Sequence, residues 1–215
     1  YGLVGSEMCI RDRMLDTSFD LRALLDSCCS IVEGQIVDWH MTFTKQIGPF
    51  WHPYLIGSEL HIRQVLINIL SNAVKYTPDG GEINFRAKET LFEEGLVHLR
   101  MEIKDNGIGM SEEFLTKLFD EFAQEQNDAR TQYKGTGLGM PITKGYVEMM
   151  GGTIAVESKK GVGTTFTVEI PMELTSSEKV EKTKKPAKRK SLKGIKVLLA
   201  EDNDLNAELA TILLE

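Results

Sequence analysis

The strongest hydrophobic pattern in the chain lies between Leu60 and Thr77. Apolar residues recur there every three or four positions, which predicts a helix that is buried along one stripe. The stripe consists of Val65, Leu66, Ile69, Leu70 and Ala73. Ser58 stands just before this helix and is expected to cap it, and the segment Pro78–Gly81 should form the turn that ends it.

Upstream of this helix, the pattern predicts two strands and a second helix. A short strand at residues 18–21 leads into a helix. The buried side of that helix should carry Leu21, Leu24, Leu25, Cys28, Ile31 and Val32. Residues 38–47 are β-branched and aromatic with loose alternation, which predicts a strand. Residues 48–57 contain two prolines and are expected to form a loop.

Downstream, period-two alternation predicts two pairs of strands. The pairs are residues 82–88 with residues 97–104, and residues 153–158 with residues 164–170. Between the pairs, Ser111 should cap a short helix over residues 112–119. Another helix should begin at the Met140–Pro141 step and end at Gly151.

The composition is that of a soluble globular chain with room for one sizeable core. The chain has 215 residues, of which 41% are hydrophobic and 27% charged. Its formal net charge of −7 does not indicate nucleic-acid binding. No apolar run reaches the ~18 residues that a membrane span needs. Cys9, Cys28 and Cys29 match neither a metal-ligand spacing nor a disulfide framework, which favours reduced thiols in a cytoplasmic protein.

Polar side chains occupy one face of the central predicted helix, beside its apolar stripe. Asn68, Asn72, Lys75 and Tyr76 follow one another at i, i+4, i+7 and i+8 and therefore share that face. A carboxamide oxygen can ligate a hard cation, an ammonium can meet phosphate oxygens, and an aromatic ring can pack on a base. Taken alone, the same pattern also fits the outer face of an ordinary amphipathic helix.

A second candidate site begins where the strand at residues 97–104 ends. Asp105 is followed by Gly107 and Gly109. Glycines let the backbone approach a ligand closely, and a carboxylate can accept a hydrogen bond from an exocyclic amine such as that of adenine. Taken alone, this sequence favours an ordinary turn after a strand.

A third region combines aromatic residues, a polar stretch and a glycine-rich loop. Phe119 and Phe122 are expected to anchor a loop to the core. Residues 124–134 are polar and include Arg130, which is typical of a lid that moves over a site. Residues 135–139 then run into a helix N-terminus, where free N–H groups can bind an anion. This loop completes neither a dinucleotide-binding fingerprint nor a Walker A motif, so it is a weak signal alone.

Taken in order, these segments resemble the N, G1, F and G2 boxes of the ATP-binding domain of sensor histidine kinases. That domain belongs to a wider family shared with DNA gyrase, a heat-shock chaperone and mismatch-repair ATPases. The resemblance covers residues 18–172 and depends on four boxes in the right order. It implies a two-layer α/β sandwich of the Bergerat type, with a mixed sheet, helices on one face, and ATP held between helices under a lid.

The resemblance also implies ATP and Mg²⁺ as cofactors and a role for each motif residue. Asn72 should ligate Mg²⁺ with Asn68 close by, and Lys75 should meet the phosphates, so these three form the expected catalytic set. Tyr76 should lie near the adenine, and Asp105 should bind the adenine amine. The other nucleotide-binding residues that the resemblance implies are Gly107, Gly109, Phe119, Arg130, Gly135, Thr136, Gly137, Leu138 and Gly139.

Position 68 separates two kinds of chemistry within the family that the chain resembles. The gyrase-like ATPases carry a glutamate one turn before the metal-binding asparagine, where it acts as a base for water. Asn68 stands at that position here, and a carboxamide is no useful base near neutral pH. The chain is therefore expected to be an ATP-dependent protein histidine kinase. A non-catalytic nucleotide-sensing module and a serine kinase of the anti-sigma type are the alternatives.

The phosphoacceptor is not visible among the four histidines of the chain. His40, His52, His61 and His98 all lack the context that the kinase family uses, and His61 is expected to be a partly exposed helix residue. The expected partner is a dimerisation and histidine-phosphotransfer hairpin of the same kinase, upstream of this piece. The intact parent is expected to be a homodimer that acts in the cytoplasm, with inner-membrane anchoring left open.

The two ends of the chain are interpreted separately. Residues 1–13 show no clear periodicity and are interpreted as a non-native leader, residues 14–172 as the catalytic domain, and residues 173–194 as a flexible basic linker. Residues 195–215 resemble the truncated βα start of a receiver domain, with Glu201 and Asp202 as an incomplete Mg²⁺ site. A kinase domain followed by a receiver implies a hybrid kinase in a phosphorelay, with a receiver or response regulator as partner and no nucleic acid.

Overall fold

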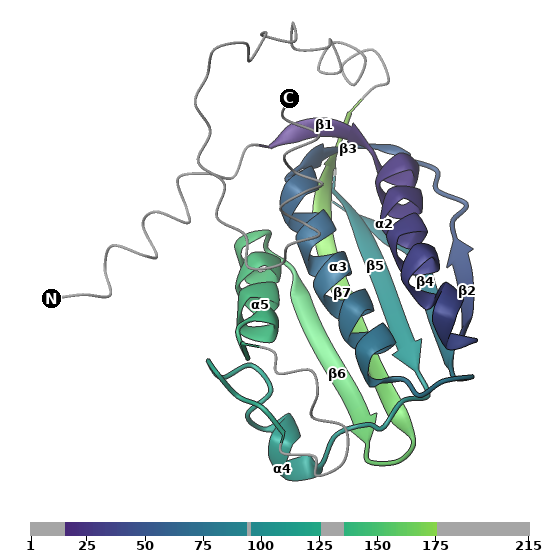
Figure 1. The fold of residues 1–215 in the computed structure, drawn as a ribbon. Helices are drawn as coiled ribbons and strands as arrows, with labels where there is room; N and C mark the ends of the chain where they lie inside the picture. Colours follow the sequence, from purple (N-terminus) through teal and green to yellow (C-terminus); the bar gives the residue numbers. More distant parts are fainter. Residues whose placement is uncertain (1–15, 94–95, 126–135, 176–215) are drawn as a thin grey trace, which may run out of the picture. The chain divides into compact units, whose positions relative to one another are not determined.

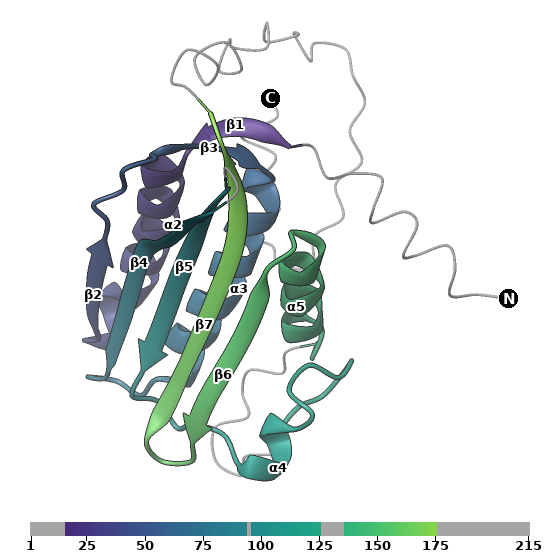
Figure 2. The same ribbon diagram turned by 180° about the vertical axis from the view of Figure 1, so that it is seen from behind.

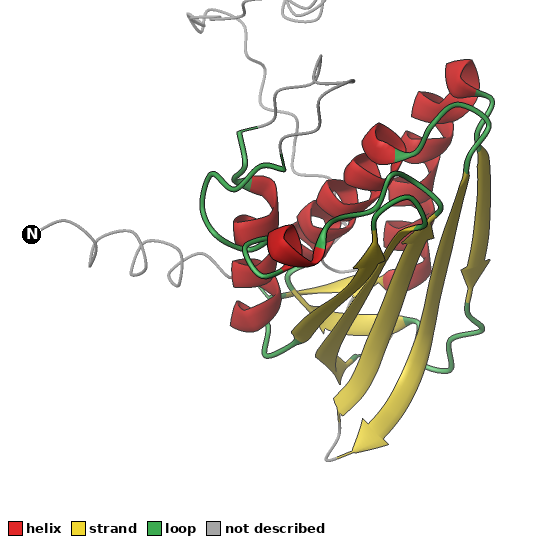
Figure 3. Ribbon diagram, turned by 90° about the horizontal axis from the view of Figure 1, so that it is seen from below, coloured by secondary structure: helices red, strands yellow, loops and turns green. Residues whose placement is uncertain are grey.

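The computed structural model describes residues 16–93, 96–125 and 136–175, which form a sheet covered by helices on one face (Figure 1). From behind, the strands lie in front of the helices (Figure 2). From below, the helices again lie on one side of the sheet (Figure 3). The predicted two-layer α/β sandwich is therefore confirmed, whereas the predicted leader, linker and receiver start lie outside the described residues.

The sheet has seven strands in the order β1-β3-β7-β5-β4-β2, and β6 also pairs with β7. The strands are β1 (Thr17–Asp20), β2 (Thr42–Ile47), β3 (Tyr54–Gly57), β4 (Glu82–Glu93), β5 (Leu96–Asp105), β6 (Thr153–Lys159) and β7 (Gly163–Leu174). Only β2 and β4 pair in parallel, and the other pairs are antiparallel, so the sheet is mixed. The register sets Asp105, the last residue of β5, opposite Thr164 of β7.

Three longer helices and two short ones accompany the sheet within the described residues. They are α2 (Leu21–Ile36), the 3₁₀-helix η1 (Val37–Trp39), α3 (Glu59–Tyr76), α4 (Glu112–Leu115) and α5 (Gly139–Met149). In the layer above the sheet, α3 lies between α2 and α5 (Figure 1). The Ser111 hydroxyl accepts a hydrogen bond from the Phe114 N–H at 3.2 Å, so the predicted cap of α4 is confirmed.

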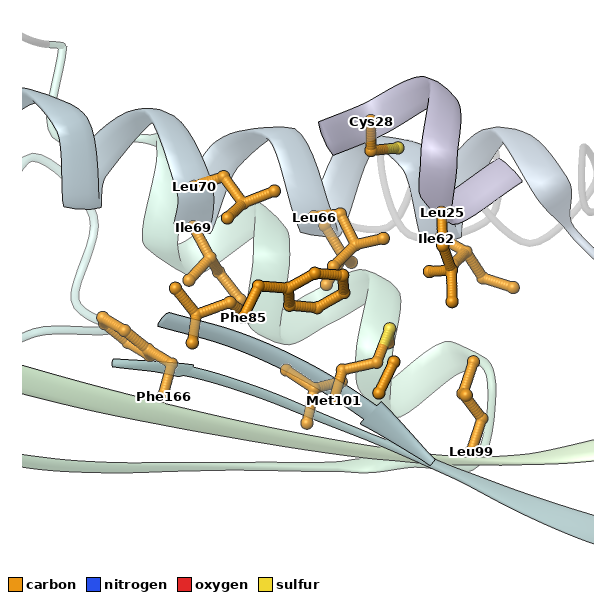
Figure 4. Packing of buried hydrophobic residues seen from close by; sticks show 14 of the residues in the cluster. Leu25, Cys28, Ile62, Leu66, Ile69, Leu70, Phe85, Leu99, Met101 and Phe166 are labelled. Carbon is orange, nitrogen blue, oxygen red and sulfur yellow. The ribbon is translucent and has the colours of Figure 1, made fainter. Parts of the chain in front are cut away.

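The core forms where α3 packs on the sheet, and the predicted apolar stripe of α3 is confirmed. Leu66, Ile69 and Leu70 point toward Phe85 of β4 and Met101 of β5, and all five side chains are fully buried (Figure 4). Burial of each such side chain stabilises the fold by about 1.5–3 kcal/mol relative to exposure. The stripe therefore fixes the rotation of α3 about its axis.

Three predicted boundaries were wrong because short segments carry little periodic signal. The strand predicted at residues 38–47 begins only at Thr42, because η1 precedes it and His40 has a positive φ of 49°. The loop predicted at residues 48–57 ends in strand β3, of which only Leu55 is buried. The helix predicted at residues 112–119 already ends at Leu115.

Two side-chain predictions were also wrong. Ile31 is 44% exposed, whereas Cys29 joins Cys28 in the core. The reason is that the buried side of α2 is centred near Val32, which places Cys29 inside it and Ile31 outside it. Ser58 is the N-cap of α3, but its hydroxyl makes no cap hydrogen bond and instead contacts Nδ1 of His61 at 2.6 Å.

The two cysteines of α2 are buried free thiols. Burial raises the pKa of the Cys29 thiol to about 12 and also raises the pKa of Cys28. A protonated, buried thiol is a poor nucleophile, so these cysteines act as core residues. No helix in the described parts of the chain is long and apolar enough to cross a membrane.

Leu66 and Leu60 of α3 form a matched pair for testing the core, since their side chains are 0% and 69% exposed. We expect Leu66→Ala to lower the free energy of unfolding by about 2–5 kcal/mol, because it leaves a cavity between α3 and the sheet. Leu60→Ala should change it by less than about 0.5 kcal/mol. Urea denaturation of both variants measures this difference, and equal losses would contradict the placement of α3.

Candidate functional site

Most of the candidate residues lie along the C-terminal half of α3, in the loop after β5 and at the start of α5. Hydrogen bonds from Asn68 to Gly139 and from Asn72 to Met140 join α3 to the first turn of α5. The N–H of Ile108, in the loop after β5, donates to the carbonyl of Tyr76 at the end of α3 at 3.1 Å. Three motifs that are far apart in the sequence therefore line one region of the described structure.

Asp105 is a buried carboxylate held by backbone donors. Its Oδ1 accepts hydrogen bonds from the N–H of Gly107 at 2.9 Å and of Thr164 at 3.2 Å. The residue is 7% exposed, and this burial raises the pKa of the carboxyl group, although the two hydrogen bonds lower it. The bond to Gly107 forms the ordinary turn that this stretch of sequence favours when taken alone. The turn does not exclude a ligand site at the same residue. Both bonds engage the same oxygen, which leaves Oδ2 for a ligand.

Two glycines after Asp105 are fixed by close backbone contacts. A Cβ on Gly107 would lie 2.5 Å from the carbonyl oxygen of Tyr76. Gly109 has a φ of +61°, and a Cβ there would lie 2.0 Å from the carbonyl oxygen of Lys159, the last residue of β6. No other residue type fits either position without moving the backbone. These glycines therefore let the loop pack between α3 and the turn after β6.

The two asparagines of α3 both turn toward α5. Asn68 Nδ2 donates to the Thr143 hydroxyl at 3.2 Å and lies 3.4 Å from the Gly139 carbonyl oxygen. Asn72 Nδ2 lies 3.4 Å from the sulfur of Met140. The predicted shared face of α3 thus lies along the contact between α3 and α5. The carboxamides there are in part structural, which the sequence did not reveal.

Lys75 and Tyr76 lie at the C-terminal end of the same face. The Lys75 Nζ is 5.0 Å from the centroid of the Tyr76 ring, within the range of a cation–π contact. Tyr76 is exposed, so its ring can pack on a flat ligand. The ammonium and the ring therefore stand together at the end of α3 whose backbone contacts the loop that follows Asp105.

Of the two phenylalanines that were expected to anchor a loop to the core, only Phe119 does so with its side chain. Phe119 is half-buried against the core, and the Nζ of Lys144 lies 5.4 Å from its ring centroid. Phe122 is 66% exposed, so its side chain is not an anchor. Its backbone is the anchor instead, because it has a positive φ of 62° and its N–H donates to the Gly137 carbonyl at 3.2 Å. A Cβ on Gly137 would lie 2.7 Å from the Cα of Phe122, so this contact requires glycine.

The described residues include most, but not all, of the predicted site. Within the glycine-rich loop, the Leu138 N–H lies 3.4 Å from the Thr136 hydroxyl, and Gly139 begins α5. The remaining predicted site residues, Arg130, Gly135, Glu201 and Asp202, lie outside the described residues. Sequence reasoning missed Thr143, whose only signal was its spacing of four residues after Gly139 on a predicted helix.

The chain is similar to one known protein family and to several sensor kinases. The family model of histidine kinase-, DNA gyrase B- and HSP90-like ATPases matches residues 57–174. The sensor histidine kinase AruS of Pseudomonas aeruginosa is 38% identical over 197 residues, which cover 92% of this chain and 19% of AruS. The autoinducer 2 sensor kinase/phosphatase LuxQ of Vibrio vulnificus is 38% identical over 152 residues, which cover 69% of this chain and 18% of LuxQ. The chain thus spans about a fifth of the length of these relatives.

Solved structures share the fold. The catalytic domain of histidine kinase ThkA, in a nucleotide-free form, superimposes with a TM-score of 0.60 at 26% identity and covers 74% of this chain and 97% of that domain. The family model matches more than half of the chain, and the segments that it matches are those that form the site. The chain therefore belongs to the histidine kinase-, DNA gyrase B- and HSP90-like ATPase family.

Proposed function

We propose that this chain carries the ATP-binding catalytic domain of a hybrid sensor histidine kinase. The domain transfers the γ-phosphoryl group of Mg-ATP to a histidine on a dimerisation hairpin of the same kinase. A receiver domain or response regulator takes the phosphoryl group next, and the intact kinase is a homodimer that works in the cytoplasm. Family membership and the likeness to sensor kinases support the ATP site.

The nucleotide is proposed to lie along the α3 face, with its base toward β5. The Oδ2 atom of Asp105 accepts a hydrogen bond from the adenine amine, and the exposed Tyr76 ring packs beside the base. The Lys75 ammonium meets phosphate oxygens. Phe119 is proposed to border the site, and Arg130 and the loop 135–139 complete it at the phosphate end. Glu201 and Asp202 remain proposed Mg²⁺ ligands of the receiver.

Magnesium fits the donors at the phosphate end. Asn68 and Asn72 supply amide oxygens, which are hard ligands. The described residues contain no group of three His, Cys, Asp or Glu side chains that could hold a metal. Mg²⁺ keeps several water or phosphate ligands, so a few amide oxygens suffice. When bound, it neutralises the charge on the phosphate oxygens.

The contact of Asn68 with α5 is the single observation that carries the kinase assignment. Its amide nitrogen is held by Thr143 and Gly139, and a carboxamide removes no proton from water near neutral pH. Phosphoryl transfer depends mainly on positioning and on charge neutralisation, which the proposed site supplies. The site therefore presents the γ-phosphate to a nucleophile from outside it.

The direct test mixes the 215-residue chain with a separate dimerisation hairpin that bears a phosphoacceptor histidine. With Mg²⁺ and γ-labelled ATP, we expect label on the hairpin that is lost in acid and stable in base. A hairpin whose histidine is replaced by glutamine is the control and should stay unlabelled. Acid-stable label would favour a serine kinase, and nucleotide binding without label would favour a sensing module. Fast phosphate release without a hairpin would contradict the kinase assignment.

Asp105→Asn should separate stability from recognition. Because burial raises the pKa of Asp105, its ionised form is disfavoured in the fold, and its contribution to stability falls as the pH rises through the raised pKa. The amide keeps an oxygen for Gly107 and Thr164 but carries no charge. Without nucleotide, the variant should therefore melt at a higher temperature than the wild type at pH 7, and this gap should close toward about pH 4.

Binding of the nucleotide should change in the opposite direction. An amide N–H₂ facing the adenine amine replaces a charged acceptor, so we expect Asp105→Asn to weaken ATP binding about 10- to 100-fold by calorimetry. Glu157→Gln, at an exposed position of β6, is the matched control and should change neither quantity. Unchanged ATP affinity in the Asp105 variant would contradict the proposed contact with adenine.

A further inference from the structure

Thr143 is a buried hydroxyl residue in the contact between α5 and α3. It is 0% exposed, and its Oγ1 donates to the carbonyl of Gly139, one turn earlier in α5, at 2.8 Å. This bond uses the only proton of the hydroxyl group. The Oγ1 atom therefore presents only lone pairs to a neighbouring side chain.

Asn68 meets Thr143 and Gly139 as two acceptors. Its Nδ2 lies 3.2 Å from the Thr143 Oγ1 and 3.4 Å from the Gly139 carbonyl oxygen. A carbonyl oxygen can only accept, and the threonine proton is already engaged, so an amide oxygen turned toward α5 would face two oxygens. The chemistry of these two acceptors, rather than the shape of the site, requires the amide nitrogen to point at α5.

The orientation of the nitrogen fixes that of the oxygen. Asn68 Oδ1 then lies on the opposite side of the carboxamide, where it accepts from Gln64 Nε2 at 3.1 Å. The neighbouring Asn72 follows the same rule, because its Nδ2 faces the sulfur of Met140, which is a weak acceptor. The first turn of α5 thus presents acceptors to both asparagines and leaves both amide oxygens directed elsewhere.

We propose that Thr143 is a positioning residue that holds the Asn68 carboxamide with its nitrogen on α5 and its oxygen turned away from α5, where Mg²⁺ would take the place of Gln64 as the partner of that oxygen. The consequence for catalysis depends on the proposed kinase function, but the orientation itself does not. The same acceptors disfavour a carboxylate at position 68, because an anion there would face the Gly139 carbonyl oxygen. The fold therefore matches an asparagine, and not a water-activating acid, at this position.

The orientation can be measured by NMR on the unmodified chain. The Asn68 side-chain N–H₂ signals are assigned as the pair that is missing from the spectrum of Asn68→Ala. We expect them to lie downfield of exposed asparagine amides and to exchange more slowly with water, because their protons are held by two acceptors. Exchange as fast as that of an exposed asparagine would overturn the proposal, whatever happens to the variants.

Thr143→Val and Thr143→Ser then separate the hydroxyl from the volume of the side chain. In Thr143→Val, the Asn68 N–H₂ signals should move toward those of exposed amides, and phosphoryl transfer to the hairpin should slow about three- to tenfold. Affinity for Mg-ATP should change less than about twofold. Thr143→Ser keeps the acceptor and should preserve the wild-type signals and rate.

The outcomes distinguish this proposal from the proposed function. Unchanged Asn68 N–H₂ signals in folded Thr143→Val would overturn the positioning role, and so would changed signals with an unchanged transfer rate. If the valine variant does not fold, the N–H₂ exchange in the unmodified chain and in Thr143→Ser decides the question. A wild-type chain that transfers no phosphoryl group would contradict the kinase function and the catalytic consequence, but not the measured orientation.

Discussion

The packing of α3 on the sheet is the constraint on which the rest of the site depends. Leu66, Ile69 and Leu70 are locked against Phe85 and Met101, so α3 cannot rotate without exposing them (Figure 4). Successive residues of a helix are rotated by a fixed angle, so the buried stripe also decides where the polar face points. That face meets α5 on one side and the loop after β5 at its end. A hydrophobic contact thus sets the geometry of the polar chemistry.

The proposed site also contains a buried charge that costs stability and glycines that adopt unusual backbone conformations. Asp105 is a buried carboxylate with a raised pKa, although two backbone N–H groups stabilise its charge. Gly109 and Gly137 have positive φ angles and allow backbone contacts that any side chain would block. Binding sites often keep such unfavourable features because a ligand compensates for them. Asp105, Gly109 and Gly137 all belong to the motifs that are proposed to bind the nucleotide.

The elements that the sequence predicted well are those with long periodic patterns. The stripe of α3 and the strand pairs β4–β5 and β6–β7 were clear because many residues repeat the same signal. Strand β3 has four residues, too few for alternation to appear, and the exposure of Ile31 depends on where the buried side of α2 is centred. The roles of Ser58 and Phe122 depend on tertiary contacts, with His61 and Gly137, that no local pattern contains. Within the candidate site, motif order proposed the residues, but only the structure showed that the asparagines contact α5.

Isothermal titration calorimetry of the unmodified chain with a non-hydrolysable ATP analogue tests the central claim most directly. The account predicts one binding event that is strong with Mg²⁺ and at least about tenfold weaker with the metal chelated, because the amide oxygens of α3 are proposed to meet the nucleotide through the metal. Asn72→Ala should remove most of this dependence on metal. No heat of binding, or binding of equal strength with and without Mg²⁺, would contradict the account.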